Sequence, residues 1–311
     1  MSEAFTQSAM HAAPGSGAEL LHELGLVLYI GAGLIFTAVM CLVIYAVFTP
    51  ERRADMRRWV IGGGVIFPVV TLSALLVYSL SIGNSLELHA PDDALRIQVT
   101  GKQWWWEVRY EAEDFEGAIV LANELHIPAD RRVRIELTTS DVIHSFWAPS
   151  LAGKVDMIPG RTNHLVLEVD EPGVYRGQCA EYCGGQHAWM AFHVIVEPEE
   201  NFRAWLAGQV QPASTPDDPF LKLGYDMFFR GECHECHAIR GTPANATDGP
   251  DLTHVGSRHS LAAGMLRNHI GTMAGWIAGA QDMKPGAAMP SMNVYTGREL
   301  RALSAWLESL E

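Results

Sequence analysis

The chain has 311 residues, five cysteines and a formal net charge of −14. Its 48% apolar content excludes an intrinsically disordered protein. The acidic balance argues against a nucleic-acid-binding protein, because such proteins need a basic patch to neutralise phosphates. Five cysteines are also too few for a disulfide-stabilised scaffold. Four of them form the close pairs Cys179/Cys183 and Cys233/Cys236, a spacing that favours metal or cofactor chemistry.

Two uncharged segments, residues 24–48 and 59–82, predict a membrane-spanning hairpin. About 20 apolar residues cross the hydrocarbon of a bilayer, so each segment is long enough to span it; a buried core helix is the alternative. No Lys or Arg precedes the first segment, which therefore lacks the basic start of a cleaved signal peptide. The short connection contains a basic cluster: Arg52, Arg53, Arg57 and Arg58. By the positive-inside rule this connection is cytoplasmic, and both termini lie on the outer side.

The remainder of the chain changes from a strand pattern to a helix pattern. Period-two apolar alternation, as at 95–99 and 133–137, predicts an all-β sandwich or barrel. After a polar stretch, Asp218 and Pro219 form a typical helix start, and Thr296 and Glu299 fit a capping box. We therefore expect a multidomain protein with five parts: an outer N-terminal tail (1–23), a two-helix transmembrane hairpin (24–83), an all-β domain (84–207), a linker (208–218) and a small all-α domain (219–311).

The richest stretch for metal binding is residues 179–190, which read CAEYCGGQHAWM. It contains five potential ligands: Cys179, Glu181, Cys183, His187 and Met190. His144 lies upstream, at the end of another apolar run. Thiolate, thioether and imidazole together favour copper, whereas structural zinc usually takes four Cys or His ligands. A disulfide between the two cysteines is the other alternative, since the outer compartment is oxidising.

Two cysteines allow two copper ions to share bridging sulfurs. His144 would bind one ion and His187 the other, giving each ion three strong ligands. The Met190 sulfur and the Glu181 carbonyl would then be weak outer ligands. Such a centre shares one electron between two ions in a preset geometry, which suits electron transfer.

The pattern C-x-E-x-C-x3-H-x2-M resembles the dinuclear CuA signature of cytochrome c oxidase subunit II. Three further stretches resemble segments of the same family: 101–106 (GKQWWW), 141–147 (DVIHSFW) and 154–161 (KVDMIPGR). The resemblance covers residues 20–200 and implies a two-helix anchor followed by a cupredoxin-like barrel. Lys102 and Trp105 stand where the family usually has His and Tyr, and neither position is a copper ligand.

The resemblance also implies two residue roles beyond copper ligation. The Glu181 carboxylate would reach a magnesium ion shared with the catalytic subunit I. Trp104 would be the point at which electrons from cytochrome c enter. Ordinary strand packing is the alternative for the tryptophan run, although three consecutive tryptophans must point to both faces of a strand.

The second redox motif is Cys233-His-Glu-Cys236-His237, the attachment pattern of c-type haem. The two thiols would form thioethers with the porphyrin, and His237 would ligate the iron. A thioredoxin-like pair is the alternative, but the motif lacks a βαβ context. A distal methionine commonly completes such a site. Met289, which precedes Pro290, is our first choice and Met292 the second; the other candidates are Met265, Met273 and Met283.

This C-terminal segment resembles class I cytochromes c, in which the distal methionine often precedes a proline. Residues 249–252 (GPDL) resemble the family's G-P-x-L segment, and there the proline carbonyl orients the proximal histidine, here His237. Ligation by a second histidine is the alternative, with these candidates: His234, His254, His259 and His269.

The whole chain thus resembles subunit II of a bacterial haem–copper oxidase with a fused cytochrome c domain. That resemblance implies an electron-input subunit that passes electrons from haem c through CuA to subunit I. The overall reaction would be oxidation of cytochrome c by oxygen, coupled to proton translocation, with no oxygen-reducing centre in this chain. Expected partners are subunit I, subunit III, the lipid bilayer and a cytochrome c or docked respiratory complex.

The same resemblance places the chain in the bacterial inner membrane with both termini on the periplasmic side. Residues 84–211 carry twice as many acidic as basic side chains, a surface that either attracts a basic partner or is merely solvated. Two other functions fit the motifs. One is a stand-alone membrane-anchored electron-transfer or copper-delivery protein, and the other is the CuA module of a nitrogen-oxide reductase. Quinol oxidase subunits of this type lack the copper ligands.

Overall fold

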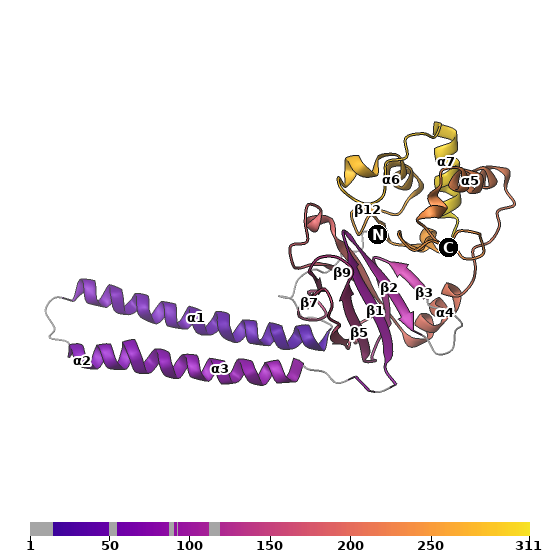
Figure 1. Cartoon of the computed structure of the whole chain (residues 1–311). Helices are drawn as coiled ribbons and strands as arrows, with labels where there is room; N and C mark the ends of the chain where they lie inside the picture. The colour runs from indigo at the N-terminus through magenta and orange to yellow at the C-terminus, as the bar shows by residue number, and fades with distance from the viewer. Residues whose placement is uncertain (1–14, 50–54, 87–89, 92, 112–118) are drawn as a thin grey trace.

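A computed structural model describes residues 15–49, 55–86, 90–91, 93–111 and 119–311. Two long helical segments lie side by side and project from the rest of the molecule (Figure 1). The first is α1 (Ser16–Phe48); the second runs through α2 (Met56–Arg58), the π-helical η1 (Trp59–Ile66) and α3 (Phe67–Leu86). Residues 1–14, and Arg52 and Arg53 of the basic connection, lie outside the described residues.

The two segments have the composition of membrane spans. Their most apolar windows have mean hydropathies of 2.5 and 2.3, and no residue of these windows is buried within the protein. At about 1.5 Å per residue, α1 is longer than the roughly 30 Å of hydrocarbon, so one end extends beyond it. That end is attached to the β-sheet part of the protein, where the Ser16 amide donates to the Glu168 carbonyl at 3.2 Å. The Ala18 amide donates to the Leu151 carbonyl at 3.3 Å.

The part from β1 to α4, which we call the β domain, consists of two five-stranded sheets. In spatial order the first contains β3 (Ile119–Ala122), β2 (Trp105–Glu111), β1 (Leu95–Lys102), β5 (Val133–Thr139) and β8 (Asn163–Leu167). The second contains β4 (Glu124–Pro128), β10 (Ala191–Glu197), β9 (Gly173–Cys179), β6 (His144–Trp147) and β7 (Val155–Met157). The helix α4 (Glu199–Gln209) follows.

The apolar residues that alternate in the sequence lie on the buried faces of the strands. Ile97 and Val99 of β1 are buried, and so are Trp106 and Val108 of β2, because alternate side chains of a strand point to one face. These side chains join one continuous core between the two sheets. The expected cupredoxin-like β fold is therefore confirmed, and it brings the ends of β6 and β9 next to each other through the Phe146–Cys179 pairing.

The part from α5 to α7, which we call the helical domain, has a separate core. Its elements are α5 (Pro219–Arg230), η3 (Cys233–Glu235), η4 (Val255–Ser257), β11 (Ser260–Leu261), β12 (Leu266–Arg267), α6 (Ile270–Met283) and α7 (Gly297–Glu308). Asp218 accepts hydrogen bonds from the Phe220 and Leu221 amides, and the Thr296/Glu299 capping box is present. The short β11–β12 hairpin is an addition to the expected all-α fold.

The helices α5 and α7 pack closely around Gly224. A Cβ atom at that position would lie 2.1 Å from the Ala302 carbonyl oxygen, so a larger residue would force the helices apart. Trp306 of α7 packs edge-on against Phe228 of α5, with 5.4 Å between ring centroids. This helix pair forms one wall of the region that holds the second redox motif.

The helical domain lies against the β domain (Figure 1). The turn of the β11–β12 hairpin contacts the second sheet, where the Ala191 amide donates to the Ala263 carbonyl at 3.0 Å. Arg176 donates to the Gly264 carbonyl at 3.2 Å. These contacts bring the two cysteine motifs of the sequence to facing sides of one interface.

Candidate metal centre and haem pocket

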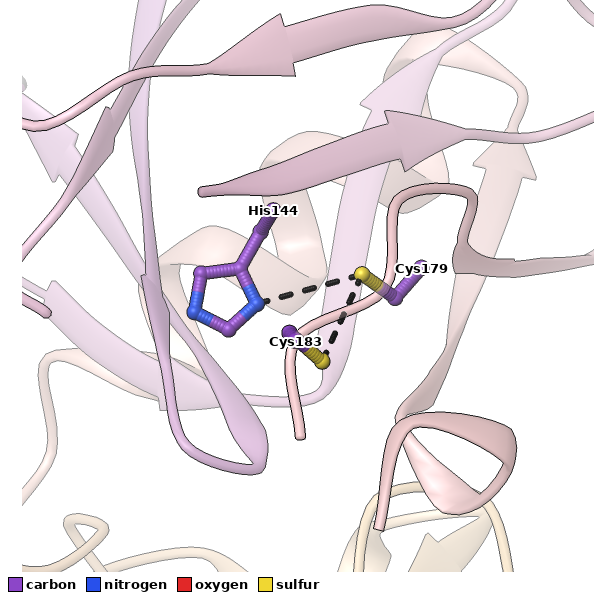
Figure 2. A group of neighbouring side chains, drawn as sticks. All are labelled: His144, Cys179 and Cys183. Atoms are coloured by element: carbon purple, nitrogen blue, oxygen red, sulfur yellow. Dashed lines mark hydrogen bonds between the residues drawn. The ribbon is translucent and has the colours of Figure 1, made fainter. Parts of the chain in front are cut away.

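The first cysteine motif forms a cluster of sulfur and nitrogen atoms at one end of the β domain. His144 begins β6 and Cys179 ends β9, so the strand pairing places them side by side. The Cys179 Sγ lies 3.8 Å from the His144 Nδ1 and 3.8 Å from the Cys183 Sγ. Figure 2 shows the three side chains directed at one another, a group compatible with a metal ion.

The remaining expected ligands complete the cluster. The Cys183 Sγ lies 3.5 Å from the His187 Nδ1 and 3.7 Å from the Met190 Sδ. The Glu181 carbonyl oxygen lies 3.2 Å from the Cys179 Sγ. All six donors predicted from the sequence are thus brought together, and four are almost completely buried: His144, Cys179, Cys183 and Met190.

The donor set fits copper better than the alternatives. The two sulfur atoms are 3.8 Å apart, far beyond the roughly 2.05 Å of a disulfide bond. Two thiols, two imidazoles, a thioether and a carbonyl form a soft donor set of the kind that copper prefers. The two sulfur atoms, each with one imidazole nearby, would provide ligands for a pair of copper ions.

The protonation of the two cysteines is coupled. The hydrogen bond between the two thiols lowers the pKa of Cys179, although burial opposes this effect. The same hydrogen bond, with burial, raises the pKa of Cys183. Cys179 is therefore the more acidic of the two thiols. Metal binding would have to displace the proton of Cys183, because the thiolate is the ligand.

Asp141 orients His144, a role that sequence reasoning missed. Its Oδ1 lies 2.8 Å from the His144 Nε2, which leaves Nδ1 directed at Cys179. Burial alone would raise the pKa of Asp141, but hydrogen bonds from His144 and from the Gln103 and Val142 amides lower it overall. Metal-binding histidines usually have such a carboxylate on the other ring nitrogen. The available signal was an aspartate three residues before the histidine.

The second motif lines a cavity of about 280 Å³ between the helical domain and the β domain. Cys233, Cys236 and His237 all contribute to its wall, as expected for haem attachment. The His237 Nδ1 lies 2.7 Å from the Pro250 carbonyl, so one ring nitrogen is hydrogen-bonded and the other is free for iron. Apolar side chains form much of the remaining wall, including Phe228, Met273, Trp276, Ile277, Leu303 and Leu307. These residues fit a covalently bound haem.

The structure narrows the choice of a distal ligand. Met289, Met292 and Met273 line the cavity. Met265 does not belong to the cavity wall as described, and Met283 is 40% exposed. His234, His254, His259 and His269 are likewise not among the residues that form this wall in the described part of the chain.

Trp104 connects the two sites. Its indole lines the haem cavity, and its Nε1 donates to the Cys183 carbonyl at 2.9 Å. The neighbouring Gln103 side chain donates to the same carbonyl at 2.6 Å. The other two tryptophans differ: Trp105 also lines the cavity, whereas Trp106 is fully buried in the β-domain core. The tryptophan run thus serves both an interface and a core, and the sequence did not indicate the part played by Trp105.

Comparisons with known proteins agree with this division. Residues 118–197 match the family model described as cytochrome c oxidase subunit II, periplasmic domain, and residues 221–311 match cytochrome c. Cytochrome c oxidase subunit 2 of Alkalihalophilus pseudofirmus is 39% identical over 247 residues, with 79% of this chain and 69% of that protein covered. The subunit of Bacillus sp. PS3 is 31% identical over 265 residues, with 79% and 72% covered.

Among solved structures, the periplasmic domain of subunit II of the Bradyrhizobium japonicum cytochrome oxidase is 32% identical. It covers 39% of this chain and 97% of that one, with a TM-score of 0.35. The two family matches imply copper in the β domain and haem in the helical domain. They support a membrane-anchored protein with an electron-transfer role in a haem–copper oxidase. The chain belongs to the cytochrome c oxidase subunit II family.

Proposed function

We propose that this chain is the electron-input subunit of a respiratory haem–copper oxidase, passing electrons from a cytochrome c to the subunit I that reduces oxygen to water. The observation that carries this proposal is the position of Trp104, which lines the haem cavity and donates to the carbonyl of Cys183 in the metal centre. Together with Gln103, which donates to the same carbonyl, Trp104 supports a direct connection between the two candidate redox sites.

The residues that would hold the two groups lie on opposite sides of this indole. A copper pair would be held by His144, Cys179, Glu181, Cys183, His187 and Met190. A haem c would be attached through Cys233 and Cys236, with His237 and Met289 as iron ligands. When bound, the haem supplies a one-electron donor and the copper pair a one-electron acceptor.

In this proposal Trp104 transfers electrons between the two domains of this chain and does not receive them from another protein. A Cβ atom on Gly286 of the helical domain would lie 3.6 Å from the indole Cη2, so the helical domain packs directly on the ring. This contact obstructs access to the ring by a soluble cytochrome c. We therefore assign Trp104 to transfer between the helical domain and the β domain rather than to the entry of electrons from outside.

The membrane part of the proposal rests on the two apolar helices. They would anchor the chain in the bacterial inner membrane with Arg57 and Arg58 on the cytoplasmic side. Both termini, the β domain and the helical domain would then lie in the periplasm, beside subunit I and subunit III. The overall reaction would be coupled to proton translocation in the assembled complex, with oxygen reduction in subunit I.

Glu181 supports the proposed junction with subunit I. Its carbonyl faces the sulfur cluster, and its carboxylate accepts a hydrogen bond from the Tyr182 amide at 3.3 Å. Tyr182 itself is 74% exposed, so this loop presents an aromatic ring beside the metal centre. In the proposed complex the carboxylate would reach a magnesium ion shared with subunit I.

Burial disfavours a copper-delivery protein. A delivery site must exchange its metal with a partner, but His144 is 0% exposed and Cys183 is 2% exposed. The relatives described above are oxidase subunits, which favours an oxidase over a nitrogen-oxide reductase.

Purification of the full chain from its native membrane in mild detergent tests the proposal. We expect larger membrane subunits to co-purify, together with copper, haem c and oxygen consumption driven by reduced cytochrome c. A lone chain that binds both groups but has no oxidase partner would contradict the proposal.

A further inference from the structure

Lys284 is a buried cation at the interface between the two domains. It follows α6 in the helical domain and is 3% exposed. Its Nζ donates to the carbonyls of Trp104 and Trp189 in the β domain, both at 2.8 Å. It also donates to the carbonyl of Ala262, in the hairpin turn of its own domain, at 3.1 Å. One ammonium group therefore connects three separate segments of the chain. One of these segments contains Trp189, the neighbour of the candidate metal ligand Met190.

Three neutral carbonyls are an unusual environment for a lysine. Moving a charged ammonium group out of water is unfavourable unless charged or hydrogen-bonding partners compensate. Burial accordingly lowers the pKa of Lys284 to about 8. An apolar side chain would fill the same space without that penalty. The arrangement is explained if the directional bonds of the ammonium group, rather than its packing, are what the interface requires.

The position of Lys284 in the chain links these bonds to the haem pocket. It begins the loop 284–289, which ends at the candidate iron ligand Met289. The Gln281 side chain holds the loop internally, donating to the Ala287 carbonyl at 2.7 Å and to the Met289 carbonyl at 2.6 Å. A second contact to the β domain is the bond from the Gln186 side chain to the Pro285 carbonyl at 2.9 Å.

The loop is therefore hydrogen-bonded to α6 through Gln281 and attached to the β domain at its start. Any movement of the β domain away from Lys284 would separate the loop from Trp104, because the contact of Gly286 with the indole lies on the same loop. The connection between the domains, residues 208–218, is itself held against the helical domain, where the Ala213 amide donates to the Arg240 carbonyl at 2.8 Å. The domains are also joined away from this loop, where the His259 amide donates to the buried Glu124 carboxylate at 2.6 Å, so Lys284 anchors the loop rather than the whole interface.

We propose that Lys284 is a positioning residue that fixes the Met289 loop to Trp104 and Trp189, and so sets the separation between the haem pocket and the metal centre. This inference rests on the proposed function. Lys284 does not touch the reacting groups; it holds the Met289 loop against the β domain in the arrangement in which transfer is fast. Its loss would leave the hairpin contacts between the domains in place but release the loop from Trp104, and transfer would then depend on the return of the loop.

The test uses the intact oxidase complex carrying Lys284→Met, with Lys222→Met as the matched control. Lys222 lies exposed on α5, so the control removes an ammonium group of the same domain without touching the interface. After rapid reduction of the haem, the rate of electron transfer to copper is measured at two solvent viscosities. Optical and paramagnetic spectra show whether both groups remain bound in their normal environments.

We expect about tenfold slower transfer for Lys284→Met, since charge-assisted hydrogen bonds between the domains are lost. We also expect the rate to become sensitive to viscosity, while both spectra and the Lys222→Met rate stay normal. Lys284→Arg, which keeps a cation and its donors, should restore part of the rate. If Lys284→Met fails to assemble, Gln186→Ala removes the second contact of the same loop and should produce a smaller slowing with the same viscosity dependence.

Two results would overturn the inference. One is a normal, viscosity-independent rate in Lys284→Met or, where that variant does not assemble, in Gln186→Ala. The other is a slowing explained by altered haem or copper spectra. Failure of the proposed function is distinguishable, because the wild-type complex would then show no transfer from haem to copper at all.

Discussion

The indole nitrogen of Trp104 donates a hydrogen bond to the carbonyl oxygen of Cys183 at 2.9 Å. The two residues are 79 positions apart in the chain, and each belongs to a different segment of the β domain. Because Trp104 also lines the candidate haem cavity, this bond joins the wall of one candidate site to a candidate ligand of the other. Gln103 lines the same cavity and donates to the same carbonyl at 2.6 Å, so two neighbouring side chains connect the candidate sites.

Trp104→Leu should slow transfer from haem to copper by about 10–100-fold, because misplacement of a transfer path by a single ångström has effects of that size. Both metal spectra should remain unchanged, since the indole is not a ligand. Rapid-mixing spectroscopy on the complex measures the rate. The matched control is Trp205→Leu, where the tryptophan stacks on His126 away from the cavity, with 3.9 Å between ring centroids. Equal rates in the two variants would remove Trp104 from the path.

Asp141→Asn should weaken copper binding about 10–100-fold while the fold is retained, because carboxylates behind metal-binding histidines typically contribute that much. Asparagine has nearly the same shape as aspartate but no negative charge. The variant therefore removes only the charge of the carboxylate whose Oδ1 lies 2.8 Å from the His144 Nε2. Competition with a copper chelator measures the affinity, and Asp170→Asn, at an exposed position, is the control. An unchanged affinity would mean that His144 is held by the strand alone.

Met190→Leu should leave copper bound but shift its reduction potential and slow transfer. The swap conserves volume, so it should change the free energy of unfolding by less than about 1.5 kcal/mol. The Met190 sulfur lies 3.7 Å from the Cys183 Sγ, in the position of a weak ligand. A redox titration with copper quantitation checks both points. Complete loss of copper from a folded variant would show that the thioether is an essential ligand.

Acid should destabilise the protein through His193. This side chain is 2% exposed, and burial lowers its pKa to about 4. The unfolded chain, with an ordinary pKa of about 6.5, binds the proton more tightly throughout this interval. The free energy of unfolding should therefore be highest above about pH 6.5 and fall by about 2–3 kcal/mol as the pH approaches 4.

Denaturant titrations of the detergent-solubilised protein at several pH values measure this dependence. His193→Gln should flatten it, whereas His164→Gln, at an exposed position, should leave it intact. The same pH dependence in both variants would show that other groups cause the acid destabilisation.

The metal centre was predictable from sequence because most of it is local. Five of its six donors lie within residues 179–190, and His144 was identifiable as a histidine at the end of an apolar run. The candidate haem-binding residues Cys233, Cys236 and His237 were predictable for the same reason, since they lie within five residues of sequence. The alternation of the strands and the two helix caps could also be predicted from the sequence, because they depend on residues that are close together in the chain.

The interface was not predictable, because it depends on contacts between distant segments. Lys284 and Trp104 are 180 positions apart, and no periodicity or spacing relates them. Trp105 looked like part of a strand, and only the docking of the helical domain makes it part of the haem cavity. Asp141 lay within a recognisable stretch, but its orienting role follows from the bend that returns its carboxylate to the ring of His144.

The most direct test of the central claim is the kinetics of copper reduction after the haem of the intact complex is rapidly reduced, measured over a range of protein concentrations. If one chain holds both groups on either side of Trp104, haem oxidation and copper reduction will share one rate constant that does not change on dilution. A rate that falls in proportion to concentration, or copper that stays oxidised while the haem is reduced, would contradict the account.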